Sequence, residues 1–340
     1  MDVSVYLDPR KGFAETRVPF EVRWDPLTGQ SCRLLPEGSI PPPARHDLER
    51  LAEETRPNCP FCGAALEKQT PRFPLGVVAE GRIRVGESAL FPNLVPYAKW
   101  GSVSVYSPER HLLPIEQITS MLLADNLRAQ VAFAQAVLAH DPASSWISIN
   151  ANHLPPSGSS IFHPHLQGTA DPRPTTVQRL LSELPGSTIR SYLEAERDSG
   201  ERHIASSGRV DWLAGFAPIG PAEIRAIVSG ARSPEQLDDA AVEELAHGLV
   251  AALCVYALLG FESFNLALYG SPPSRGGEHL ILRLVARAYF GPQMRSDAMW
   301  SERLHWEGAT DIAPERTAEL VRTELARRRA PPAGAARPPG

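Results

Sequence analysis

The sequence predicts an α+β protein in which one unit of helices and antiparallel strands occurs twice. The first copy has the order long helix, strand, loop and strand, at about 115–139, 146–150, 151–162 and 163–167. The second copy repeats that order at about 235–258, 264–269, 270–277 and 279–285. Both loops contain a Pro-Pro-Ser tripeptide, and Pro155 aligns with Pro272 without a gap across the unit. The repeat therefore predicts two similar half-domains.

The remaining elements follow from periodicity and turn residues. Apolar residues recur near a period of 3.6 in helices, whereas proline and glycine bracket short strands. Before the first copy we expect two strands within 18–36, an extended loop at 37–45, a helix at 45–56, and strands near 82–85, 89–91 and 102–106. Elsewhere we expect helical residues at 175–198, a strand at 210–217, and helices at 221–229 and 314–328. We assign the half-domains to 1–203 and 204–329, with 330–340 as a disordered tail.

Composition argues against several classes of function. The 34 Lys and Arg residues are outnumbered by 39 Asp and Glu residues, giving a net charge of -5 without the basic excess of a nucleic-acid-binding surface. No apolar run approaches the length that spans a bilayer, and the N-terminus lacks the pattern of a secretory signal. The four cysteines suggest no disulfide framework. We therefore expect a cytoplasmic protein that binds neither nucleic acid nor membrane.

The turn Cys59-Pro-Phe-Cys62 supplies half of a zinc site. Cysteines two positions apart, with a proline between them and a glycine after them, let two thiolates face one ion. His111 and one of the pair His163 and His165 are candidates for the two missing ligands. A redox Cys-x-x-Cys is one alternative, but it usually opens a helix in a βαβ unit, which we do not expect here. A plain turn without metal is the other alternative.

The stretch 150–167 carries the most chemistry. His163, His165 and Gln167 alternate along the expected strand and therefore share one face. A neutral imidazole can attack phosphorus, and the loop Ser157-Gly-Ser-Ser160 can offer N–H groups and hydroxyls to phosphate oxygens. These features predict a phosphate-handling site. The alternative is an edge strand with two surface histidines, because Pro164 cannot donate to a ladder.

Four motifs in order resemble those of galactose-1-phosphate uridylyltransferases, a branch of the histidine-triad superfamily. They are Arg23-Trp-Asp-Pro-Leu-Thr-Gly29, Cys59-Pro-Phe-Cys62, Ser107-Pro-Glu-Arg-His111, and Asn152 followed by Gly158-Ser-Ser-Ile-Phe-His-Pro-His-Leu-Gln167. The likeness covers nearly the whole chain. It implies two histidine-triad-like half-domains, each an antiparallel sheet packed with helices, of which the second is degenerate. It also implies a homodimer and a nucleotidyltransferase of the hexose-1-phosphate uridylyltransferase type.

The resemblance implies a role for each site residue. His165 would be the nucleophile of a ping-pong reaction that moves a nucleoside monophosphate from a nucleoside diphosphate sugar to a phosphorylated acceptor. Gln167 and Ser160 would bind its phosphate oxygens. The expected substrate-binding residues are Asn93, Asn152, Gly158, Ser159 and Asn265. One structural zinc ion per chain would be held by Cys59, Cys62, His111 and His163.

The chain also departs from the family pattern. Residues 35–45 lack the two arginines that would hold the acceptor phosphate, with Arg45 as the one displaced substitute. Because an arginine–phosphate pair is bidentate and specific, this loss favours a hydrolase or phosphorylase, in which water or inorganic phosphate releases the nucleotide. A non-catalytic, zinc-stabilised binding protein is a further alternative. The second-lobe His-x-His is replaced by Leu282-Arg-Leu284, so we expect no second metal.

Overall fold

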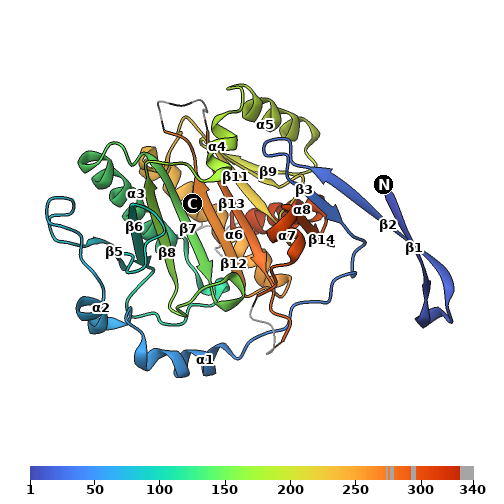
Figure 1. Ribbon diagram of the computed structural model, residues 1–340, viewed down its shortest axis with the longest axis horizontal. Helices are drawn as coiled ribbons and strands as arrows, with labels where there is room; N and C mark the ends of the chain where they lie inside the picture. The colour runs from blue at the N-terminus through green and yellow to red at the C-terminus, as the bar shows by residue number, and fades with distance from the viewer. Residues whose placement is uncertain (273–274, 276–278, 292–295, 330–340) are drawn as a thin grey trace, which may run out of the picture.

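A computed structural model describes residues 1–272, 275, 279–291 and 296–329 (Figure 1). It contains a ten-stranded sheet of order β4-β5-β6-β8-β7-β12-β13-β11-β10-β9 and a four-stranded sheet of order β1-β2-β3-β14. The mixture of antiparallel sheets and helices confirms the α+β class. The tail 330–340, for which disorder was predicted, lies outside the described residues, as do Pro273 and Ser274 of the second Pro-Pro-Ser segment.

The elements have the following bounds. The large sheet contains β4 (Ile83–Val85), β5 (Ser88–Pro92), β6 (Trp100–Val105), β7 (Trp146–His153), β8 (His165–Asp171), β9 (His203–Ser207), β10 (Val210–Ala214), β11 (Ile224–Ser229), β12 (Ser263–Tyr269) and β13 (His279–Arg287). The small sheet contains β1 (Asp2–Asp8), β2 (Ala14–Trp24), β3 (Ser31–Leu34) and β14 (Glu307–Thr310). The helices are α1 (Leu48–Thr55), α2 (Gly63–Gln69), α3 (Ser120–His140), α4 (Thr176–Ser182), α5 (Thr188–Ser199), α6 (Asp239–Leu258), α7 (Trp300–His305) and α8 (Pro314–Arg329).

The internal repeat is visible in the strand order of the large sheet. β7 and β12 pair antiparallel at its centre, and each half then runs outward through four further strands. Asn150 of β7 pairs with Ala267 of β12, and the same sequence separation relates Pro155 to Pro272. The two halves are therefore related by a pseudo-two-fold axis at this pair, within one continuous sheet. The domain boundary predicted at 203/204 falls at the first residues of β9, the outermost strand of the second half.

Helices cover the two faces of the large sheet unequally. α3, α6 and α8 lie against one face, where alternate residues of the central strands enter the main apolar core. On the other face, α4 and α5 cover only the second half, through a smaller core that includes Leu193, Leu213 and Tyr269. Over β7 and β8 that face carries the half-buried polar residues Asn150 and Gln167. The uneven cover leaves the first half of the sheet open on the face that carries Asn150 and Gln167, within the stretch for which the sequence predicted the chemistry.

One predicted helix is wrong, and several elements were missed. Residues 221–229 form β11 rather than a helix, because Ile224–Ser229 pairs with both β10 and β13. Pro221 followed by Ala222 and Glu223 resembles a helix start, but a strand buried on both faces loses the alternation that identifies strands in sequence. The sequence analysis also missed β1, β9, β14, α2 and α7.

Helix α6 is long and apolar enough to cross a membrane when judged by length and composition. However, 67% of its apolar window is buried inside the protein, and its residues form part of the main core with α3 and α8. This burial identifies α6 as a core helix.

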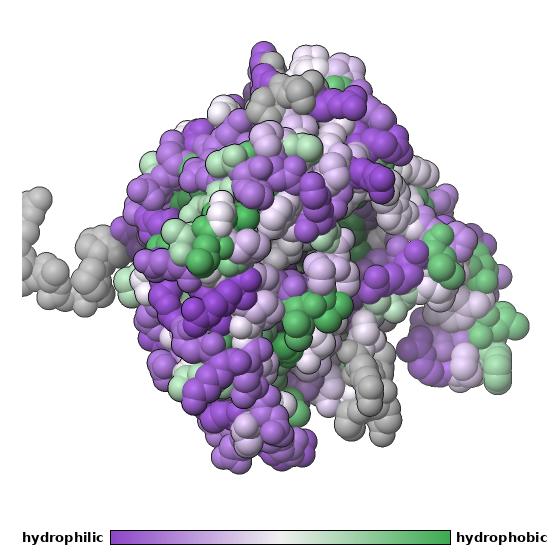
Figure 2. Space-filling view, turned by 60° about the vertical axis from the view of Figure 1, so that its left-hand side comes forward, coloured by the Kyte–Doolittle hydropathy of each residue, from purple (hydrophilic) through white to green (hydrophobic). Residues whose placement is uncertain are grey.

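The β1–β2 hairpin projects from the rest of the molecule (Figure 1). Its apolar side chains Val3, Val5, Leu7 and Phe13 are exposed. Figure 2 shows hydrophobic residues on this projection, at the right of the view.

A buried ionic network fixes the turn after β2 to the second half of the large sheet. Glu223 accepts hydrogen bonds from Nε of Arg225 at 2.7 Å and from Nε of Arg283 at 2.8 Å, and Arg225 also contacts Asp25. Burial alone would raise the pKa of Glu223, but the two arginines outweigh it and hold that pKa below its ordinary value. Arg283 stands between Leu282 and Leu284, so the segment that lacks the second His-x-His carries the network instead.

Replacing Glu223 by glutamine should lower the free energy of unfolding by about 3–5 kcal/mol, because Arg225 and Arg283 would lose their buried counter-charge. Urea unfolding would measure the loss. The control is Glu15→Gln, which breaks an exposed ion pair with Arg17 and should leave the urea midpoint nearly unchanged. Equal midpoints for the two variants would contradict the importance of the network.

Candidate active site

Four metal-ligating side chains meet at one end of the first half. The ligand atoms of Cys59, Cys62, His111 and His163 all lie within 4.8 Å of one another. They come from the turn before α2, the turn after β6 and the bend before β8. The N–H of Gly63 donates to the carbonyl of Pro108 at 3.0 Å and joins the first two turns. The structure thus brings together the four residues predicted as metal ligands.

Both histidines of this cluster present Nδ1 toward the cysteines. Nδ1 of His111 lies 3.2 Å and Nδ1 of His163 lies 3.4 Å from Sγ of Cys62. Nε2 of His163 donates to the carbonyl of Ser107 at 2.9 Å, and Nε2 of His111 lies 2.9 Å from Oγ1 of Thr55. In both rings the proton is on Nε2, where it forms these hydrogen bonds, so the lone pair is on Nδ1. The Nδ1 lone pair can therefore bind a metal ion next to the cysteines.

Burial favours the neutral forms of Cys62, His111 and His163 through its effect on their pKa values. It lowers the pKa of His163 to about 4 and raises the pKa of the Cys62 thiol to about 12. A bound dication reverses the effect on the thiol, because its charge favours the thiolate. Two sulfur and two imidazole ligands form the donor set of a tetrahedral, closed zinc site. The cluster therefore fits a structural metal ion. The helix that follows Cys62 directly is α2, which the sequence analysis missed.

The histidines next to this cluster do not lie on an edge strand. β8 begins at His165, two residues later than predicted, and His163 lies in the preceding bend. β8 pairs with β6 on one side and β7 on the other, and His163 and His165 are only 0% and 7% exposed. The alternative of an edge strand with two surface histidines is therefore wrong. Pro164 is tolerated because it precedes the ladder.

His165 has the geometry of a nucleophile. Its Nδ1 donates to the carbonyl of His163 at 2.8 Å, so that the lone pair is on Nε2. Burial lowers the pKa of His165, against a smaller opposing effect of that hydrogen bond, and the ring is neutral near pH 7. Phe61 contacts the ring edge-on, with centroids 5.6 Å apart. A neutral, oriented imidazole is what attack on phosphorus requires.

Two adjoining cavities lie on the open face. The one that His165 lines has a volume of about 220 Å³, and its neighbour has a volume of about 490 Å³. His165, Ser160 and Gln167, the three residues predicted to be catalytic, all line the smaller cavity. Both cavities share Asn93, Tyr97 and Gln167. Asn152 lines the larger one, so the predicted substrate-binding residues Asn93 and Asn152 both face this space.

The other predicted substrate-binding residues support the loop. Asn265, from the second half, donates to Oδ1 of Asn152 at 2.6 Å and to the carbonyl of Ser157 at 3.0 Å. Ser159 donates to the carbonyl of Ile161 at 2.7 Å, and Gly158 adopts a left-handed conformation with φ of 89°. Gly158, Ser159 and Asn265 are therefore not among the residues that line the two cavities.

The sequence analysis missed the apolar wall of the smaller cavity. Phe61 lies between the two cysteines and contacts both histidine rings edge-on. Phe91, Val103 and the 82% exposed Tyr97 complete the apolar side. Only Phe61 could have been predicted to line this cavity, because it lies inside the Cys-Pro-Phe-Cys turn. Strand residues such as Phe91 cannot be told from ordinary core residues in the sequence.

No family model matches this chain. An uncharacterized protein of Archaeoglobus fulgidus is 30% identical over 312 residues, which cover 89% of this chain and 91% of the archaeal protein. The chain belongs to the family of that archaeal protein.

Solved structures establish the fold. The ADP-glucose phosphorylase of Arabidopsis thaliana, solved with bound ADP-glucose, superposes with a TM-score of 0.65 at 18% identity, over 89% of this chain and 99% of that one. A GalT-like protein of Arabidopsis thaliana gives 0.63 at 19% identity, over 89% and 98%. A uridylyltransferase gives 0.59 at 18% identity, over 90% and 99%. The chain has the GalT-like fold, which confirms the resemblance read from its motifs.

Within this GalT-like fold, Arg45, the arginine predicted as a displaced phosphate ligand, lines neither of the two cavities. Arg173, in the loop after β8, lines the larger cavity together with Thr175 and Gln178. Among the described residues that line the two cavities, the one arginine therefore comes from a segment for which the sequence predicted no role.

The pH dependence of stability should report on His153, the last residue of β7. Its ring stacks on Phe264 with centroids 4.9 Å apart, and burial lowers its pKa to about 3. In the unfolded chain His153 is protonated below about pH 6.5, whereas in the folded chain it stays neutral down to a much lower pH. The free energy of unfolding therefore falls as the pH drops below about 6.5, by up to about 1.4 kcal/mol per pH unit. Urea unfolding between about pH 7 and about pH 5 should show a shallower slope for His153→Phe. The exposed His140→Phe should keep the native slope, and equal slopes for both variants would refute the assignment.

Proposed function

We propose that this protein is a nucleotidyltransferase that takes a nucleoside monophosphate from a nucleoside diphosphate sugar onto Nε2 of His165. The observation that carries this proposal is the hydrogen bond from Nδ1 of His165 to the carbonyl of His163, which directs the Nε2 lone pair away from the backbone. The same imidazole lines a cavity with Ser160 and Gln167, whose hydroxyl and amide groups can donate to phosphate oxygens.

The transfer has two balanced steps. In the first, Nε2 attacks the α-phosphorus, the bond from that phosphorus to the bridging oxygen breaks, and a sugar 1-phosphate leaves with the electron pair. The Nδ1 proton stays in its bond to the carbonyl of His163, which stabilises the positive ring of the adduct. In the second step an acceptor oxygen attacks the same phosphorus, and the P–N bond returns its electrons to Nε2. Imidazole leaves more easily than an alkoxide, so the adduct can be released.

We further propose that Cys59, Cys62, His111 and His163 hold one structural zinc ion per chain. Such an ion supplies fixed geometry rather than a reacting group. His163 connects the cluster to the nucleophile, since its ring faces the cysteines while its carbonyl holds Nδ1 of His165. A metal ion that holds the ring of His163 in place therefore also helps to hold its backbone carbonyl, which accepts the hydrogen bond that orients His165.

A second candidate reaction is phosphorolysis or hydrolysis of the adduct. It is favoured by the lining of the larger cavity, where Arg173 is present and Arg45 is absent. A single cation suits inorganic phosphate better than it suits a sugar phosphate held by an arginine pair. Similarity to a structure described as an ADP-glucose phosphorylase agrees with this candidate.

Intact mass measurement tests the adduct directly. After incubation with ADP-glucose or UDP-glucose, the protein should gain one nucleoside monophosphate, and His165→Ala should gain none. The control is His140→Ala, because His140 is exposed at the end of α3 and should not affect labelling. Failure of the wild-type protein to form an adduct with any nucleoside diphosphate sugar would favour the non-catalytic binding protein. Discharge by glucose 1-phosphate, by inorganic phosphate or by water alone would identify the acceptor.

Metal analysis tests the cluster. The purified protein should contain about one zinc per chain, and Cys59→Ser should lose it. Thr55→Val removes the partner of His111 Nε2 and should weaken zinc affinity about 10–100-fold, whereas Thr55→Ser keeps the hydroxyl and should retain most of it. A chain that remains folded and free of metal after mild purification would reject the zinc proposal without affecting the adduct test.

A further inference from the structure

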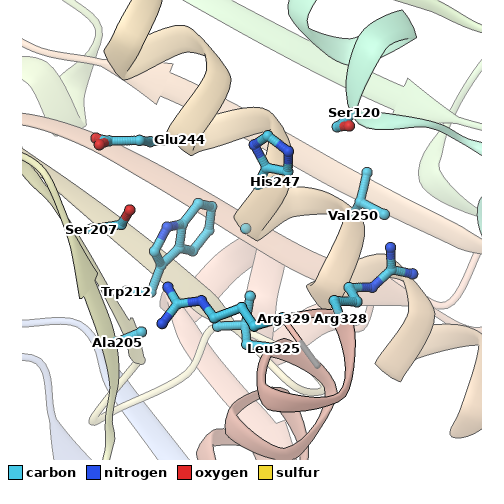
Figure 3. Close-up of a pocket in the computed structure, with 11 residues that line it drawn as sticks. Ser120, Ala205, Ser207, Trp212, Glu244, His247, Val250, Leu325, Arg328 and Arg329 are labelled. Carbon is cyan, nitrogen blue, oxygen red and sulfur yellow. The ribbon is translucent and has the colours of Figure 1, made fainter. Parts of the chain in front are cut away.

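A further cavity, of about 470 Å³, lies on the face of the large sheet that α3, α6 and α8 cover (Figure 3). Its walls come from α6, from the last turns of α8 and from the β9–β10 hairpin. Trp212 of β10 belongs to the core on this face, whereas its neighbour Leu213 belongs to the core under α4 and α5. The sheet therefore separates this cavity from the face that carries His165. None of its lining residues is part of the site described above.

Two glycines shape the walls of this cavity. A Cβ on Gly248 of α6 would lie 2.1 Å from the indole of Trp212, so only glycine allows the helix to pack on the flat ring. A Cβ on Gly208, in the β9–β10 turn, would lie 2.0 Å from Oε1 of Glu244. Glycine there lets the carboxylate approach the turn. The space is thus bounded by rigid packing, and its volume falls within the range of small-molecule sites.

The lining separates into an apolar part and a cationic part. Ala205, Trp212, Val250 and Leu325 supply the apolar surface. Arg328 and Arg329 supply the positive charge from the C-terminal turn of α8. Figure 3 shows Arg328 extending toward Val250 of α6 and Arg329 extending toward Trp212. This combination binds an anion attached to a flat apolar body, because guanidinium groups pair with anions and stack on aromatic faces.

The two arginines differ in how they are held. Nε of Arg328 donates to Glu324 at 2.7 Å, and its Nη2 donates to Sγ of Cys254 at 2.8 Å. Among the described residues, Arg329 makes no hydrogen bond or ion pair, and its guanidinium extends toward the side of the cavity where Trp212 and Ser207 lie (Figure 3). Arg328 is therefore preorganised, while the charge of Arg329 is available to a ligand.

Glu244 adds an acidic group to the lining, and in Figure 3 it lies on the same side of the view as Ser207, Trp212 and the guanidinium of Arg329. Its Oε2 is buried and receives no hydrogen bond from the described residues, so the carboxylate is not neutralised locally. A ligand that carries an N–H or O–H donor as well as its anionic group would complement this carboxylate through its second oxygen. The lining thus combines a carboxylate and two guanidinium groups with apolar surface.

We infer that this cavity is a second small-molecule site, specific for a flat aromatic anion such as an aryl carboxylate, sulfonate or phosphate. The anionic group pairs with Arg329, and the ring system lies over Val250, Leu325 and the edge of Trp212. The site is independent of nucleotidyl transfer, since the sheet separates it from His165.

Titration with 8-anilinonaphthalene-1-sulfonate tests this inference, because the dye has a flat body, a sulfonate and an N–H donor. Its fluorescence should show a saturable component with one site per chain. Arg329→Glu should weaken that component at least about tenfold. Ala205→Trp should fill the cavity and abolish it, with thermal unfolding used to show that the variant is folded.

Two matched variants decide where the dye binds. Arg327→Glu makes the same charge change in the same helical turn but outside the lining, and should change affinity less than about twofold. His165→Ala should leave dye binding unchanged. Equal affinity in the wild type, Arg329→Glu and Ala205→Trp would overturn the inference. So would equal weakening by Arg327→Glu and Arg329→Glu, which would indicate a general charge effect, or loss of binding in His165→Ala.

Discussion

The antiparallel pairing of β7 with β12 is the interaction on which the rest of the molecule depends. It joins two similar halves into one sheet and places Asn152 opposite Asn265. The amide of Asn265 then holds both Asn152 and the carbonyl of Ser157, so the second half supports the loop that leads to His165. A site built on a central pairing is rigid, because neither strand can shift register without exposing its core face.

The Cys/His cluster and His165, the proposed nucleophile, are structurally connected through His163. His163 takes part in both through different atoms, its ring toward Cys62 and its carbonyl toward His165. Thr55 and Ser107 fix the rings of the two histidine ligands from behind. A cluster at the end of one strand can in this way set the tautomer of a histidine two residues further along, without contacting the substrate.

The two halves use equivalent positions differently. In the first half, Gln167 pairs with Asn150 beside open cavities. In the second half, Arg283 pairs with Ala267 and is buried in an ionic network with Glu223 and Arg225. Helices α4 and α5 bury the position of Arg283. Because a buried charge requires a partner, the arginine pairs with Glu223. The second half therefore contributes support and stability to the first, and its other face encloses the cavity at Trp212.

The sequence by itself determined the α+β class, the repeat and the order of motifs, because each depends on local spacing. Spacing also indicated Cys59, Cys62 and His111 as metal-ligand candidates, whereas the choice of His163 over His165 as the fourth followed from the resemblance to a known family. The sequence also indicated His165, Gln167 and Ser160 as neighbours. Only the tertiary structure decided that residues 221–229 form a strand, since pairing with two neighbours overrides local helix signals. Only the tertiary structure assigned the Nε2 lone pair of His165, excluded Arg45 from the cavities and brought Arg173 to them. These features depend on contacts between residues distant in sequence, and spacing along the chain carries no information about them.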